Sequence, residues 1–129
     1  MGLLKPEELD LHYLRGNIFE NFIISDLIKA NYNYSSFNNF YFWKDSNNNE
    51  IDLIIESANE IKAIEIKSSQ TAKKDFLKNL KYFKDLPIKN KKVETFLLYG
   101  GDQEFTQNDI KIIGWKKLRN IKELGILSI

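Results

Sequence analysis

Two apolar segments joined by a short polar turn are the feature that most constrains how this chain of 129 residues can fold. Residues 51–56 and 61–67 are rich in isoleucine, which favours β-strands, and a polar turn lies between them. The two segments are therefore predicted to pair as an antiparallel hairpin. A turn centred on Ala58 and Asn59 would set the register of that pairing.

Counting outward from this turn places Asp52 directly opposite Glu65, with their Cβ atoms about 4.5–5.5 Å apart. Lys67 follows Glu65 by two residues, so it is predicted to point to the same side of the sheet. Two facing carboxylates repel each other, and a divalent cation between them would offset that repulsion. A metal in this position could polarise a phosphate and activate a bound water.

The same residues also allow a simpler interpretation, in which this side of the hairpin is an ordinary charged surface. Glu50 would face Lys67 in the same register, so a cross-strand salt bridge competes with the metal site. A slip of one residue would send Asp52 to the other side. The opposite side of the hairpin is expected to be core, formed by Ile51, Leu53, Ile55, Ile64 and Ile66.

Residues 16–30 have apolar side chains at spacings of three and four, which predicts a helix. Asn17 is a candidate N-cap, and Glu20 three residues later would complete a capping box. Glu20 also lies on or near the apolar stripe of this helix, where a carboxylate is costly without a partner. Glu20 is therefore expected either to cap the helix or to supply a third carboxylate to the centre formed by Asp52 and Glu65.

The remaining periodicities predict a single α/β domain of order αβββαβ, with a mixed central sheet flanked by helices. Residues 1–15 are expected to be an N-terminal arm and residues 16–129 the folded domain. Beyond the hairpin, strands are predicted at residues 40–44, 93–99 and 110–113, and helices at residues 72–85 and 115–124.

Composition narrows the chemistry that this domain can carry. The chain has no cysteine and a single histidine, His12, which excludes thiolate zinc sites and histidine-rich sites. Oxygen ligands remain, and these favour Mg²⁺ or Mn²⁺. The absence of cysteine is typical of a cytoplasmic protein, and no apolar run approaches the roughly 18 residues of a membrane span.

Positive charge is concentrated in one part of a chain whose net charge is only +1. Residues 73–92 contain eight lysines and only two acidic residues. A solvated helix face with its following loop would explain this composition, and so would a strip that contacts phosphate groups. In the second case Lys73, Lys74 and Lys78 are the candidate nucleic-acid contacts.

The ordered set of Glu20, Asp52, Glu65 and Lys67 resembles the PD-(D/E)xK phosphodiesterase superfamily. Ile51 departs from its pattern, in which proline usually precedes the aspartate. A closer resemblance is to an uncharacterised domain found C-terminal to the ATPase module of many prokaryotic AAA+ proteins. The segments that carry this resemblance are residues 16–22, 41–45, 49–54, 64–70 and 98–101, and it extends to Trp115.

The resemblance implies a restriction-endonuclease-like fold and Mg²⁺- or Mn²⁺-dependent cleavage of phosphodiester bonds, with DNA as the expected substrate. Asp52 and Glu65 would be metal ligands, Glu20 a helper ligand, and Lys67 would steady the attacking water. Gln70 would line the site, although a helix-capping role suits it equally.

The resemblance also implies partners. An AAA+ module in the same longer chain is expected, and many such folds pair as homodimers. The alternative is a catalytically inactive module that binds DNA or protein for an ATPase, because a fold does not fix a function.

Overall fold

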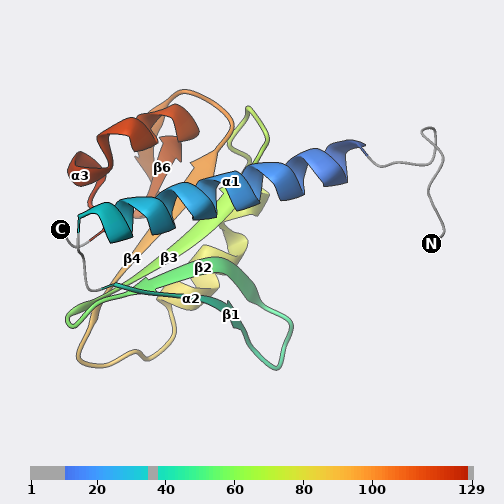
Figure 1. Ribbon diagram of the computed structural model, residues 1–129. Coiled ribbons are helices and arrows are strands. Elements are labelled where there is room, and N and C mark those ends of the chain that lie inside the picture. Colours follow the sequence, from blue (N-terminus) through green and yellow to red (C-terminus); the bar gives the residue numbers. More distant parts are fainter. Residues whose placement is uncertain (1–10, 35–37, 128–129) are drawn as a thin grey trace, which may run out of the picture.

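The computed structural model describes residues 11–34 and 38–127, and it confirms the α/β class (Figure 1). The elements follow one another as α1 (Leu11–Asn33), β1 (Asn39–Lys44), β2 (Glu50–Glu56), β3 (Glu60–Lys67), the 3₁₀ turn η2 (Lys74–Leu77), α2 (Lys78–Lys84), β4 (Lys92–Tyr99), β5 (Glu104–Gln107), β6 (Ile110–Gly114), the 3₁₀ segment η3 (Trp115–Asn120) and α3 (Ile121–Leu124).

The strands form one mixed six-stranded sheet in the order β1-β2-β3-β4-β6-β5. β3, β4 and β6 are parallel to one another, and the remaining pairs are antiparallel. The carboxyl ends of the three parallel strands therefore meet at one edge of the sheet. Ligands of open α/β sheets commonly bind beyond such an edge.

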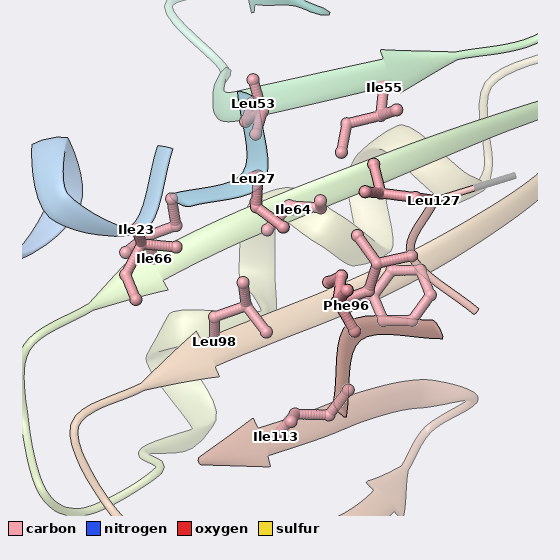
Figure 2. Packing of buried hydrophobic residues seen from close by; sticks show 12 residues of the cluster. Ile23, Leu27, Leu53, Ile55, Ile64, Ile66, Phe96, Leu98, Ile113 and Leu127 are labelled. Carbon is pink, nitrogen blue, oxygen red and sulfur yellow. The ribbon is translucent and has the colours of Figure 1, made fainter. Parts of the chain in front are cut away.

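Helices cover both faces of the sheet. Figure 1 shows α1 and α3 over one face, with α2 behind the other. Figure 2 shows Ile23 and Leu27 of α1 packing on side chains of the sheet that include Leu53 and Ile64. On the other face, residues of η2 and α2 are buried against the sheet: Leu77, Leu80 and Phe83.

The predicted register of the hairpin is confirmed over its paired residues. Leu53 lies opposite Ile64 and Glu56 opposite Ile61, as the turn requires. The Ser57 N–H donates a hydrogen bond of 2.9 Å to the carbonyl of Glu60, which closes the tight turn.

A β-bulge interrupts β2 beside Asp52. Tyr41 of β1 pairs with Ile54, and Trp43 pairs with Ile51, so two residues of β2 oppose only one residue of β1. A bulge rotates the chain that contains the extra residue. Ile51 was predicted to share a face with Leu53, and this is wrong. Because of the bulge, Ile51 packs with the α2 cluster, whereas Leu53 packs beneath α1.

The first helix starts earlier than predicted. α1 begins at Leu11, so residues 11–15 belong to the helix, and residues 1–10 of the predicted arm lie outside the described residues. Asn17 is therefore inside α1 and is not its N-cap. The capping box that would have satisfied Glu20 locally cannot form.

Other differences from the predicted elements are small. The helix predicted at residues 72–85 begins as the 3₁₀ turn η2 before it continues as α2, and the last helix is likewise preceded by η3. The short edge strand β5 was not predicted, because Glu104–Gln107 is polar and exposed along most of its length. In the part of the chain that is described, no helix is both long enough and apolar enough to cross a membrane.

Candidate functional site

Asp52 and Glu65 link β2 and β3 by hydrogen bonds, just beyond the last regular backbone pair. The Ile66 N–H donates to Asp52 Oδ2 at 2.8 Å, and the Asp52 N–H donates to Glu65 Oε1 at 3.3 Å. Each carboxylate therefore accepts from the backbone of the opposite strand, where the ladder between the strands has ended. The structure brings together the two acids that the hairpin register placed opposite each other.

Burial makes the negative charge of this pair costly. Glu65 is only 4% exposed, and its burial, with a smaller contribution from the Asp52 charge, raises the pKa of Glu65 to about 8. Burial also raises the pKa of Asp52, although the Ile66 hydrogen bond and the Lys67 charge oppose that rise. At neutral pH Glu65 therefore keeps its proton unless a cation is bound beside it.

Glu20 reaches the same centre from α1. Its burial and the charge of Asp52 raise the pKa of Glu20, whereas Lys67 acts in the opposite direction. Glu20 in turn raises the pKa of Glu65. A helix residue, a bulge residue and a strand residue thus interact electrostatically, whereas a role of Glu20 as a metal ligand stays a prediction.

Lys67 ends β3 and is the cation that all three carboxylates share. Its Nζ atom lies 5.6 Å from the centroid of the Phe76 ring, within the range of a cation–π contact. The competing salt bridge from Glu50 is not formed with Lys67. Glu50 instead contacts Lys44 of β1, with 3.4 Å between Nζ and Oε1.

The donor set fits a magnesium ion that retains water ligands. No group of three or more histidine, cysteine or acidic side chains in the described ranges is placed to hold a metal by itself. Asp52 and Glu65 each use one oxygen for a backbone N–H, and their second oxygens accept no hydrogen bond from the described residues. Mg²⁺ is usually held by one or two carboxylates, with water and substrate phosphate completing its shell.

A cleft of ≈ 680 Å³ lies beside this centre, at the carboxyl ends of β3 and β4. Its walls include sequence neighbours of Glu20 and Lys67. Its lining consists of Arg15, Phe19, Ser68, Ser69, Gln70, Lys73, Gly100 and Trp115. The predicted residues Gln70 and Lys73 are therefore in the cleft. Lys74 and Lys78 are exposed on η2 and α2 and are not among its lining residues.

The lysine-rich stretch is divided between the two ends of the sheet. At the end remote from the carboxylates, Lys91 pairs with Glu56 at 2.6 Å and Lys92 pairs with Glu94 at 3.2 Å. These lysines neutralise acids of neighbouring strands. Only the beginning of the stretch, at Lys73, reaches the cleft.

Sequence reasoning did not place Arg15, Phe19 or Trp115 in a site, because no local pattern brings Trp115 to the helix that carries Arg15 and Phe19. The two glycines after β4 were a signal that could have been used. A Cβ atom at Gly100 would overlap the carbonyl of Ser68, and one at Gly101 would lie 2.7 Å from the Gln70 oxygen. Glycine lets these two loops pack together along the cleft.

We expect Gly100→Ala to destabilise the protein by about 1–3 kcal/mol, because the loop after β3 must move to admit the methyl group. Urea unfolding followed by circular dichroism would measure this loss. Gly16→Ala is the matched control, since its Cβ would meet only Ser68 Oγ, at 3.9 Å, within a helix. That variant should gain up to about 1 kcal/mol. A Gly100→Ala protein as stable as the wild type would refute the crowding argument.

Comparison with known proteins identifies the relationship of the chain. A search of curated proteins found no match. A family model, described as a domain of unknown function (DUF4143), matches residues 15–118. The match includes the helix, the hairpin and the strands that hold the carboxylates, as well as the loops of the cleft. Because this match extends over most of the 129 residues, the chain belongs to the DUF4143 family.

Proposed function

We propose that this domain is a Mg²⁺-dependent nuclease that cleaves phosphodiester bonds of DNA. The observation that carries the proposal is the buried pair of Asp52 and Glu65 with Lys67 beside it. Two acids held together by backbone hydrogen bonds are costly to keep in a protein interior. A divalent cation would remove that cost, and it would give the arrangement a chemical use.

Each residue would have a distinct role. Asp52 and Glu65 would hold the ion through the oxygens that do not accept backbone hydrogen bonds. A bound Mg²⁺ supplies charge stabilisation at a phosphate and a more acidic water. Lys67 would donate to a non-bridging phosphate oxygen or to the attacking water, while its contact with Phe76 limits its movement. Glu20 would accept a hydrogen bond from a water ligand of the ion.

The proposal is tested by incubating the protein with DNA and RNA substrates in Mg²⁺ or Mn²⁺. We expect Lys67→Ala and Asp52→Asn each to lower the cleavage rate at least about a hundredfold, because each removes a charge aimed at the reacting phosphate or its metal. Lys44→Ala is the matched control. It removes an exposed lysine that pairs with Glu50, and it should retain the wild-type rate. Equal rates for the wild type and both site variants would rule the nuclease out.

A second candidate function is a docking module for an ATPase, and the outer face of α1 favours it. Leu14 and Ile18 lie four residues apart on this face and are 46% and 61% exposed. Contiguous exposed apolar surface often marks an interaction site. Domains of this family are often found with AAA ATPases, which supports the choice of such a module as the proposed partner. Loss of ATPase binding in Ile18→Asp, without a change in cleavage, would support this function.

A further inference from the structure

Three depressions that share lining residues extend from the carboxyl ends of β3 and β4 to the surface between α1 and η3. The first is the cleft of ≈ 680 Å³ described above, and the second is a depression of ≈ 370 Å³ that shares Gln70, Gly100 and Trp115 with it. The third, of ≈ 220 Å³, shares Trp115 and Lys116 with the second. We call this surface the trough. Its first depression has the size of a typical ligand site, for which about 300–1,000 Å³ is usual.

The chemistry of the trough combines aromatic rings with positive charge. Trp115 lines all three depressions, and its ring is held edge-on by Phe19 at 6.1 Å and by Phe22 at 6.0 Å between centroids. The cations that line the trough are Arg15, Lys73, Lys116 and Arg119, against the acids Asp26 and Asp102. Serine hydroxyls and the Gln70 amide add hydrogen-bonding groups to its first depression.

We infer that the trough binds a single-stranded nucleic acid and places its backbone at the carboxylate centre. Aromatic side chains can stack with bases only when those bases are unpaired, and flanking cations follow the backbone phosphates. A duplex would meet the cations, but its paired bases could not stack on Trp115. This inference rests on the proposed nuclease function, and it specifies the substrate as an unpaired strand.

The position of the trough relative to the carboxylates supports this assignment. Phe19 precedes Glu20 on α1, and Ser68 follows Lys67 at the end of β3. A strand stacked on the aromatic rings of the trough would therefore bring its backbone next to Lys67. Gly100, which packs closely on the loop after β3, also lines the first depression.

Binding is measured in EDTA, so that it does not depend on cleavage. The probes are an oligothymidylate and an oligouridylate of about ten nucleotides and a mixed-sequence DNA duplex of similar length. Because the chain has only two tryptophans, Trp43→Phe leaves Trp115 as the single tryptophan, whose fluorescence reports binding. We expect single strands to quench Trp115 and to bind at least about tenfold more tightly than the duplex.

Two variants test the assigned residues. Lys73→Gln with Lys116→Gln should weaken binding of single strands about tenfold. The slope of the logarithm of affinity against the logarithm of salt concentration should become shallower by about 1.4, because each lost phosphate contact changes it by about 0.7. Trp115→Leu keeps an apolar side chain against Phe19, but its affinity for single strands should fall at least about fivefold because stacking is lost. The control pair is Lys89→Gln with Lys92→Gln. Lys92 begins β4, about 23 Å from the carboxyl end of that strand at Tyr99, and the pair should bind as the wild type does.

Tighter binding of the duplex, or equal binding by the trough pair and the control pair, would overturn the inference. Quenching by both DNA and RNA strands supports it, and quenching by RNA alone supports it while contradicting the DNA assignment. The two proposals fail separately. Trough-dependent binding without metal-dependent cleavage would refute only the nuclease, whereas cleavage of duplex DNA that is unaffected by the trough variants would refute only this inference.

Discussion

Replacement of Glu65 by glutamine should stabilise the metal-free protein at alkaline pH. The pKa of Glu65 is raised from 4.5 to about 8, so the folded state keeps a proton that the unfolded chain releases. The free energy of unfolding therefore falls as pH rises through this interval, by about 4 kcal/mol from this residue. Asp52 and Glu20, whose pKa values are also raised, contribute with the same sign.

Glu65→Gln removes the ionisation but keeps an oxygen that can accept from the Asp52 N–H. We expect the variant to match the wild type near pH 4.5 and to exceed its stability above pH 8 by about 4 kcal/mol. Urea unfolding in EDTA across this range measures the difference. Glu104→Gln on the exposed strand β5 is the control and should follow the wild-type curve. If the curves of Glu65→Gln and the wild type were parallel, the burial argument would be wrong.

Metal affinity should depend steeply on pH, if Asp52 and Glu65 are the ligands. Below about pH 8, Glu65 holds a proton in the metal-free protein, and Mn²⁺ must displace that proton to bind. Well below pH 8 the apparent dissociation constant should therefore fall about tenfold for each unit of pH, and by about fiftyfold in all from pH 6 to pH 8.

Calorimetric titrations in buffers of different ionisation enthalpy measure both the affinity and the protons released. Near pH 7 we expect about one proton to be released for each Mn²⁺ bound. Glu65→Gln should bind Mn²⁺ much more weakly, although it is the more stable protein. An affinity that stays constant between pH 6 and pH 8, or binding without proton release, would exclude Glu65 as a ligand.

The sequence was sufficient to predict the central hairpin and the pair of acids it carries. A two-residue turn at Ala58 and Asn59 leaves one register in which the isoleucines are buried, and that register places Asp52 near Glu65. The predicted position of Lys67 follows from the alternation of side chains along β3. Local rules therefore predicted the part of the site that lies on adjacent strands.

The rest of the site depends on contacts between distant segments. The bulge that moves Ile51 to the other face forms against β1, and the turn between β2 and β3 contains no information about that pairing. The trough is assembled from α1, from the loops after β3 and β4, and from Trp115 after β6. No local pattern predicts that Arg15 and Trp115 line the same cleft, because only the packing of α1 on the sheet brings them together.

Because β2 contains an extra residue, the position of the Asp52 carboxylate depends on the number of residues in the strand as well as on which residues are acidic. Deleting one residue next to Asp52 would let β1 and β2 pair without interruption and would rotate that carboxylate away from Glu65. Such a protein could keep its sheet, its core and every acid while losing the ion-binding arrangement. Relatives that share the aspartate but have a strand one residue shorter would therefore be expected to fold alike and to lack the chemistry.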